Sequence, residues 1–323
     1  MKTASKFFFW FFISLATISL TLVAYFYADS KFNNIKNIIS PLPELIKHTF
    51  YSDAKAQSYW APNLAEDIST LKKITVNSRA AISYDLTTDR LLFSENINTR
   101  LPIASLTKIM TAIIALENMK LDNKITISKE ASTIGEDSMG LSEGEILSVE
   151  ELLYGLLLNS GNDAAEALAQ GSGFSRDAFL HLMNKKAEDL GLFDTRFTNP
   201  SGLEGDGDQY STVRDLLILT RYALQKKEFT RIVATYEYNI PQDSNHKAYT
   251  LYNEANLLTS YEGVKGVKTG YTDEAGMCLV TYLDYGGHEI IAVLLNSENR
   301  RSEMKVLLDY SLKSLGVTPP PHS

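Results

Sequence analysis

A serine and a lysine three residues apart, Ser105 and Lys108, open the apolar segment LPIASLTKIMTAIIALENM over residues 101–119. Residues three apart on a helix share one face, with Cβ atoms about 5–6 Å apart, so the lysine can reach the serine hydroxyl. A serine becomes nucleophilic when a base takes its proton, and a lysine becomes such a base when its pKa falls from about 10.4. The pair therefore predicts a nucleophile, Ser105, with its general base, Lys108.

The Ser-x-x-Lys spacing by itself is not specific, because it also starts at Ser52, Ser69, Ser244 and Ser302. The copy at Ser105 differs from these because it leads directly into a long apolar helix, which must be buried on nearly all sides. Burial, a second cation nearby and the positive end of a helix all lower a lysine pKa. The alternative is that the serine only caps the helix and the lysine extends to solvent.

A second candidate is Ser160-Gly161-Asn162, which links the apolar helical segment LLYGLLL to the helical segment NDAAEALAQ. A buried junction between two helices holds a hydroxyl and an amide rigidly, so this pair could pass a proton and hold a substrate backbone. Asn162 could instead be a plain helix cap.

The third candidate is Lys268-Thr269-Gly270, in the segment GVKGVKTGYTDEAGMCLV that passes into a strand. Gly270 removes a side chain where a substrate backbone could lie alongside the strand. Lys268 supplies the second cation that lowers the pKa of Lys108. The alternative is a surface edge strand with a solvated lysine.

The elements that position these residues follow from the periodicity of the chain. Two apolar runs around residues 85–89 predict a hairpin, and GMCLVTYLDYGGHEIIAVLLNS predicts a strand, a Gly-Gly turn and a strand. Helical patterns dominate from about residue 121 to 230, and RSEMKVLLDYSLKSLG predicts a last amphipathic helix. Strands near both ends with helices between predict an α/β sheet domain with an inserted helical lobe.

Together, the three motifs resemble those of penicillin-binding proteins and serine β-lactamases. Four phrases narrow the resemblance to the low-molecular-mass D-alanyl-D-alanine carboxypeptidases: ASLTKIMTA, LLYGLLLNSGNDAAEALA, FTNPSGL with YSTVRDLLILT, and GVKGVKTGYTDEAGMCLV. It covers roughly residues 78–310. The resemblance implies a β-lactamase/transpeptidase-like fold, with an antiparallel sheet flanked by helices, in a domain over residues 76–316. Its inserted all-helical lobe would span about residues 121–230, and residues 317–323 would form a tail.

The resemblance also implies a role for each motif residue. Ser105 would attack the carbonyl between the two terminal D-alanines of a peptidoglycan stem peptide, with Lys108 as general base. The other implied roles are a proton relay at Ser160, a peptide contact at Asn162, contacts with the terminal carboxylate at Lys268 and Thr269, close strand approach at Gly270, and an oxyanion hole from the backbone N–H groups of Ser105 and Tyr271. β-Lactams would acylate Ser105 as substrate mimics. A further hypothesis is that Arg300 contacts the substrate carboxylate; the alternative is that Arg300 and Arg301 are a solvated pair. No metal or cofactor is expected.

Two other classes remain as alternatives to this enzyme. A class A β-lactamase would need a Glu-x-x-Leu-Asn element, which the sequence lacks, and a penicillin-binding sensor would acylate without turnover. The G-x-S-x-G match at residues 140–144 has no apolar strand before it, so we interpret it as a loop. The net charge of −8, with scattered Lys and Arg residues, argues against nucleic-acid binding.

The N-terminus predicts a membrane segment. Lys2 and Lys6 precede the uncharged run Phe7–Tyr27, which is long enough to cross a hydrocarbon layer of ~30 Å. We expect a single-pass anchor over residues 1–28 in the cytoplasmic membrane, a linker over residues 29–75 and an extracytoplasmic catalytic domain; a cleaved signal peptide is the alternative. The single cysteine, Cys278, cannot form an internal disulfide.

Overall fold

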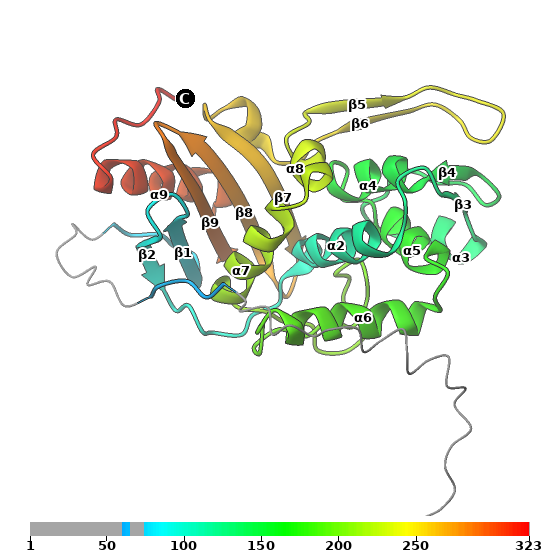
Figure 1. The fold of residues 1–323 in the computed structure, drawn as a ribbon, viewed down its shortest axis with the longest axis horizontal. Coiled ribbons are helices and arrows are strands. Elements are labelled where there is room, and N and C mark those ends of the chain that lie inside the picture. Colours follow the sequence, from blue (N-terminus) through cyan, green and yellow to red (C-terminus); the bar gives the residue numbers. More distant parts are fainter. Residues whose placement is uncertain (1–59, 65–73, 323) are drawn as a thin grey trace, which may run out of the picture. The chain divides into compact units, whose positions relative to one another are not determined.

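A five-stranded sheet with strand order β2-β1-β9-β8-β7 organises the part of the chain that the structure, a computed structural model, describes: residues 60–64 and 74–322 (Figure 1). All of its strand pairs are antiparallel. The strands are β1 (Ala80–Asp85), β2 (Arg90–Glu95), β7 (Val264–Thr272), β8 (Gly276–Tyr285) and β9 (His288–Ser297). Because β7 is at the edge of this sheet, the third predicted motif lies on an edge strand.

Both predicted hairpins of the sheet are confirmed. Strands β1 and β2 pair across the turn at residues 86–89. Strands β8 and β9 are joined by Gly286 and Gly287, whose φ angles are 62° and 83°. A type I′ turn needs positive φ at both central positions, which glycine adopts without a Cβ penalty.

The two faces of the sheet bury two different sets of side chains. Along β9, the alternating residues Ile291, Val293 and Leu295 belong to one core cluster, and Ile290, Ala292 and Leu294 belong to the other. Helix α9 (Arg300–Ser314) covers the second face with Met304, Leu307, Leu308 and Leu312, a helical spacing, so the predicted amphipathic helix is confirmed. Helix α7 (Val213–Leu224) packs against β1 and β9 on the first face.

Helix α2 (Lys108–Asn118) is the central helix of the molecule. Helices α4, α5, α6 and α7 pack around it, and residues 108–115 are buried, as the apolar segment predicts. A 3-10 turn, η3 (Ala104–Thr107), leads into α2, so the α-helix begins three residues later than Ser105. Pro102 lies two residues before this turn.

The lobe inserted before β7 is mostly helical. Its remaining helices are α3 (Lys129–Ser132), α4 (Val149–Leu157), α5 (Asn162–Gly171), α6 (Arg176–Asp189) and α8 (Lys227–Val233). The prediction of an all-helical lobe is wrong in one detail, because β3 (Lys124–Thr126) and β4 (Ile146–Ser148) form a small sheet within it. Three-residue strands have too little alternation to be recognised in a sequence.

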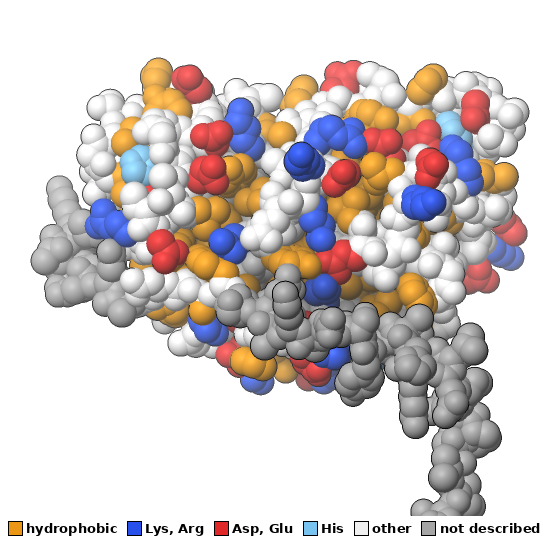
Figure 2. All heavy atoms as spheres, in the orientation of Figure 1, with side chains coloured by type: hydrophobic (Ala, Val, Ile, Leu, Met, Phe, Trp, Pro, Cys, Tyr) orange, Lys and Arg blue, Asp and Glu red, His pale blue; other side chains and the backbone are white. Residues whose placement is uncertain are grey.

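A further hairpin and a 3-10 turn connect the lobe to β7. The hairpin consists of β5 (Glu237–Ile240) and β6 (Tyr249–Tyr252), and the turn is η4 (Asn256–Thr259). On the face shown in Figure 2, Lys and Arg side chains are interspersed with Asp and Glu side chains.

The predicted membrane segment, Phe7–Tyr27, lies outside the described residues, and so does the predicted linker apart from residues 60–64 and 74–75. No helix within residues 60–64 and 74–322 combines the length and the apolar composition that a bilayer-spanning helix needs. The anchor and the linker therefore stay predictions.

Candidate active site

Ser105 lies in the 3-10 turn η3, directly before α2, and only 9% of its surface is exposed. The preceding residue, Ala104, has a φ of +47°, an unfavourable value for a residue with a Cβ. Gly202 packs against this turn so closely that a Cβ there would overlap the Ala104 carbonyl and lie 3.0 Å from Ser105 N. A neighbouring loop therefore holds the turn that presents Ser105.

The Lys108 amine is surrounded by three oxygen atoms at hydrogen-bond distance. Its Nζ lies 2.7 Å from Ser105 Oγ, 2.7 Å from Asn162 Oδ1 and 2.7 Å from the Ser201 carbonyl oxygen. The amide and carbonyl oxygens can only accept hydrogen bonds. A neutral amine would donate its two N–H groups to Asn162 and Ser201, which leaves its lone pair directed at the Ser105 hydroxyl. This geometry suits a base that removes the serine proton.

The environment of Lys108 favours this neutral form. Complete burial, followed by the positive charge of Lys268, holds the pKa of Lys108 well below its usual range. No carboxylate is among the three hydrogen-bond partners of its amine. The alternative of a lysine that extends to solvent is therefore excluded, and Ser105 makes no side-chain cap at α2, whose N-cap residue is Thr107.

Asn162 is the first residue of α5, and Ser160 belongs to the short link between α4 and α5. The Asn162 Nδ2 donates to the Gly135 carbonyl at 3.2 Å, which turns its Oδ1 toward Lys108. Ser160 has a φ of +57°, and its buried Oγ has no hydrogen-bond partner among the described residues. The structure thus joins Asn162 to the Ser105–Lys108 pair, whereas it shows no direct hydrogen bond from Ser160 Oγ to either residue.

Strand β7 passes beside the serine turn at Gly270. A Cβ on Gly270 would lie 3.0 Å from the Ile103 carbonyl oxygen and 3.2 Å from Ser105 N. Glycine therefore lets the edge strand approach the nucleophile's backbone N–H. The side chain of Tyr271 is 57% exposed, and its hydroxyl donates to Asp273 Oδ1 at 3.1 Å.

Lys268 is 1% exposed, although β7 is an edge strand, so the alternative of a solvated lysine is excluded. Its Nζ donates to the Thr269 carbonyl oxygen at 3.1 Å and lies 4.0 Å from the Glu254 carboxylate. Burial lowers the pKa of Lys268 to about 8; the Glu254 carboxylate opposes this shift, and the cation Arg300 adds to it.

Arg300, the first residue of α9, is half-buried beside the same strand. Its Nη1 donates to the Gly270 carbonyl oxygen at 2.7 Å, and burial lowers the pKa of its guanidinium from the ordinary value. Arg301 is exposed. The alternative of a solvated Arg300–Arg301 pair is therefore wrong, and Arg300 supports the strand at the motif glycine.

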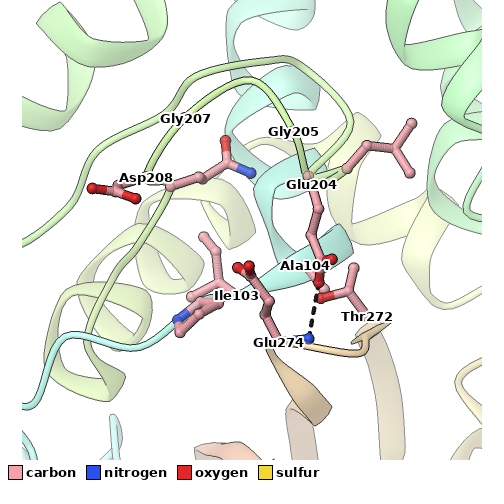
Figure 3. A pocket seen from close by; sticks show the side chains of 12 residues that line it. Ile103, Ala104, Glu204, Gly205, Gly207, Asp208, Thr272 and Glu274 are labelled. Carbon is pink, nitrogen blue, oxygen red and sulfur yellow. Dashed lines mark hydrogen bonds between the residues drawn. The ribbon is translucent and has the colours of Figure 1, made fainter.

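A cavity of about 280 Å³ opens next to the serine turn. Ile103 and Ala104 line one side of it, the loop at residues 202–209 another, and Thr272 and Glu274 at the end of β7 a third (Figure 3). The Glu204 carboxylate accepts a hydrogen bond from the Glu274 backbone N–H at 2.9 Å, which ties the loop to the strand end. The cavity thus continues the course of β7 beyond Tyr271.

A family model described as D-alanyl-D-alanine carboxypeptidase matches residues 67–299 of this chain. The chain belongs to this D-alanyl-D-alanine carboxypeptidase family. The carboxypeptidase DacF of Bacillus subtilis is 33% identical over 262 residues, which cover 79% of this chain and 67% of that protein. The crystal structure of the Streptomyces K15 DD-transpeptidase is 35% identical with a TM-score of 0.70, over 75% of this chain and 100% of that one. A penicillin-binding protein homolog from Mycobacterium tuberculosis is 28% identical with a TM-score of 0.71, over 82% and 99% of the two chains.

In this D-alanyl-D-alanine carboxypeptidase family member, two contributors to the site have no counterpart among the predicted residues. The Ser201 carbonyl holds the Lys108 amine, and the loop that carries it is organised by Asn199, whose Oδ1 accepts from the backbone N–H groups of Ser201 and Gly202. The segment FTNPSGL belongs to the resemblance, but a backbone carbonyl leaves no residue type to recognise. The second contributor, Glu254, precedes a turn without any motif of its own.

The G-x-S-x-G match at residues 140–144, which could have indicated a different serine nucleophile in this carboxypeptidase-family chain, lies in a loop. Ser142 of the G-x-S-x-G match is exposed, and its Oγ accepts a hydrogen bond from Lys247 Nζ at 2.8 Å. The match leads into the short strand β4, whereas a nucleophile of that type needs a preceding strand and a following helix. The interpretation of residues 140–144 as a loop is confirmed.

Proposed function

We propose that this protein is a serine-type D-Ala-D-Ala carboxypeptidase that removes the terminal D-alanine from peptidoglycan stem peptides. The observation that carries the proposal is the Ser105–Lys108 pair, 2.7 Å apart, with the amine's two N–H groups occupied by Asn162 and Ser201. Family membership supplies the substrate class, because the relatives are named for this reaction.

Acylation begins with proton transfer from Ser105 Oγ to Lys108 Nζ, while Oγ forms a bond to the carbonyl carbon between the two D-alanines. The C–N bond then breaks, and the leaving nitrogen takes up the proton that Lys108 Nζ accepted from Ser105. Ser160 Oγ would relay this proton. A rotation of the Ser160 hydroxyl toward the leaving nitrogen would give this presently unpartnered group its role. The products are free D-alanine and an ester on Ser105.

The developing oxyanion would be held by the backbone N–H groups of Ser105 and Tyr271. The close passage of β7 at Gly270 supports this role, because it brings the strand within a few ångströms of Ser105 N. Removal of one such donor typically costs about 2.7–4 kcal/mol of barrier. A peptide bound beside the edge strand would pair with its backbone, as extended ligands do at exposed sheet edges.

Substrate recognition would use the terminal carboxylate. Lys268 and Thr269 would bind this group, since one provides a positive charge and the other a hydroxyl donor. With the carboxylate there and the scissile carbonyl at Ser105, the rest of the stem peptide would extend past Tyr271 toward the cavity at residues 202–209. β-Lactams, which also have a carboxylate beside a reactive amide, would acylate Ser105 in the same way.

Transfer of the acyl group to an amine is a second candidate reaction, favoured by the structural similarity to a protein named as a DD-transpeptidase. The same acyl-enzyme would serve both reactions, with water or an amine as the acceptor. A β-lactamase and a non-hydrolysing sensor are weaker alternatives, because the family's named relatives are peptidases and the chain lacks the Glu-x-x-Leu-Asn element.

For the location, we propose that Phe7–Tyr27 anchors the chain in the cytoplasmic membrane with the enzyme on its outer side. The basic residues before this apolar run support this orientation. Membrane fractionation combined with protease accessibility would test it; recovery of the whole chain in the soluble fraction would contradict it.

The activity is tested by the release of D-alanine from diacyl-L-Lys-D-Ala-D-Ala, with Ser105→Ala as the inactive control. We expect turnover and covalent labelling by fluorescent penicillin in the unmodified protein, and neither in the variant. Labelling without turnover would favour a sensor or an enzyme that needs an amine acceptor. Turnover that persists in Ser105→Ala would refute the assignment of the nucleophile.

A further inference from the structure

Glu254 reaches the point where the proposed carboxylate-binding groups meet. Its Oε2 accepts a hydrogen bond from Thr269 Oγ1 at 3.1 Å and lies 4.0 Å from Lys268 Nζ. The Glu254 side chain is 41% exposed, whereas that of Lys268 is 1% exposed. A surface carboxylate thus contacts the same two side chains that would bind the carboxylate of a substrate.

We propose that Glu254 is a stand-in for the terminal carboxylate of the substrate and sets the affinity for peptides that have one, an inference that rests on the proposed function. The Thr269 hydroxyl has a single hydrogen to donate, so Glu254 and a bound substrate carboxylate compete for it. The two carboxylates also repel each other. Unit charges about 4 Å apart interact, even in bulk water, by an energy worth roughly a fivefold change in affinity.

The backbone around Glu254 allows its side chain to leave without a larger rearrangement. The Glu254 N–H donates to the Leu158 carbonyl at 3.1 Å, and the Asn253 side chain donates to the carbonyls of Val233 and Thr235, each at 3.0 Å. With this backbone held, rotation of the exposed side chain toward solvent vacates the site. The Glu254 carboxylate also opposes the fall in the Lys268 pKa that burial causes, so the variants below are compared at about pH 6, where Lys268 keeps its proton in the unmodified protein.

The substitution Glu254→Gln removes the charge and keeps both the size of the side chain and an oxygen that accepts from Thr269. Two peptides separate the effect of charge from that of shape: diacyl-L-Lys-D-Ala-D-Ala with a free carboxylate, and the same peptide as a C-terminal carboxamide. We expect KM for the carboxylate peptide to fall roughly fivefold with kcat within about twofold. Glu262→Gln, at an exposed glutamate before β7, is the matched control and should leave KM unchanged.

Binding is measured separately from turnover by calorimetry on chains that also contain Ser105→Ala. With Glu254→Gln, the dissociation constant of the carboxylate peptide should fall and that of the carboxamide peptide should stay the same. An unchanged or higher constant for the carboxylate peptide, or an equal change for both peptides, would overturn the proposal. Failure of the proposed function would show differently, as an absence of D-alanine release by the unmodified protein.

Discussion

Lys108 is fully buried, yet its three hydrogen-bond partners are neutral oxygens. An ammonium group there would lose its hydration and gain no contact with a carboxylate, so burial favours the neutral amine. The largest effect of a neighbouring charge, that of Lys268, acts in the same direction. Lys108 can therefore act as a base, but its burial stabilises the fold less than a charged, solvated lysine would.

At the residue scale, the two lysines predict the pH dependence of kcat/KM. This ratio reports the free enzyme, in which Lys108 must be neutral and Lys268 must be charged. Because burial and the charge of Lys268 hold the pKa of Lys108 well below its ordinary value, the base form appears at a lower pH than it would for a solvated lysine. Because the pKa of Lys268 is about 8, kcat/KM for a peptide with a free carboxylate should fall above that pH. A rate that keeps rising to about pH 10, as for an ordinary lysine base, would contradict this.

The test of the base is Lys108→Arg, which replaces the amine with a guanidinium that is not deprotonated in proteins and so cannot accept the serine proton. We expect the rate of acylation by fluorescent penicillin to fall by about 10²–10⁴-fold, the usual contribution of a general base. The same change at the exposed residue Lys265 of β7 should leave the rate unchanged.

The motif residues could be identified from the sequence because each is a reactive type in a segment of distinct periodicity. Ser105 and Lys108 precede a segment with no polar face, and Lys268 precedes a run of strand alternation. The contribution of Ser201 could not be identified from the sequence, because it is the backbone carbonyl of this residue that holds Lys108, and every residue has a backbone carbonyl. Glu254 was missed for another reason: nothing in the sequence places residue 254 beside residues 268 and 269 in space.

At the scale of elements, the active-site turn η3 depends on the loop at residues 199–209. Asn199 folds the first part of this loop with hydrogen bonds from the backbone N–H groups of Ser201 and Gly202. Gly202 then lies against Ala104, which has a positive φ of its own. Two segments with positive φ angles thus support each other, and the loop keeps both Ser105 and the Lys108 amine in place.

Gly202→Ala should therefore damage both stability and acylation, because the new Cβ overlaps the Ala104 carbonyl in a backbone with φ of +92°. The backbone conformation alone costs about 1–2 kcal/mol, and the overlap displaces the serine turn. Gly205→Ala is the matched control, since its φ is +103° but a Cβ there meets no atom within 4 Å. Urea unfolding and penicillin labelling should show the backbone cost in both variants and the loss of labelling only in Gly202→Ala. Equal labelling of the two variants would contradict this account.

The short elements that could not be predicted from the sequence are too short to have a recognisable periodicity. Strands β3 and β4 are three residues long, and in each the inward side chain, Ile125 or Leu147, is buried. A single buried apolar residue in each strand cannot establish a period of two. The 3-10 turn before α2 could not be recognised either, because its i to i+3 hydrogen bonds give nearly the same side-chain spacing as the first turn of an α-helix.

At the scale of the whole molecule, the active site lies where the sheet and the helical lobe meet. Ser105 and Lys108 come from the continuous segment of η3 and α2, Asn162 from the lobe and Lys268 from the edge strand of the sheet. One core cluster includes side chains of both α2 and the sheet, among them Ile109 and Val293. A substrate that contacts all three segments would therefore bridge two structural layers that already share a core.

The core also receives a contribution from residues 60–64. The Trp60 ring packs edge-on against Tyr84 with centroids 5.4 Å apart, and the Arg221 guanidinium lies 4.4 Å from the centre of the Trp60 ring. The Trp60 Nε1 donates to Asp89 Oδ1 at 3.3 Å. These contacts connect a segment within the predicted linker to β1, to the turn that follows it and to α7.

A chain that begins at residue 59 should therefore be more stable than one that begins at Ile74. An aromatic pair contributes about 0.5–1.5 kcal/mol and an exposed cation–π contact about 0.5–1 kcal/mol, so the shorter chain should lose roughly 1–2.5 kcal/mol of unfolding free energy in urea. Trp60→Ala in the longer chain should reproduce most of this loss. Both chains should still be labelled by fluorescent penicillin, because Trp60 packs at β1 and α7, away from the Ser105 and Lys108 contacts. Equal urea midpoints for the two chains would show that residues 60–64 add nothing to the stability of the core.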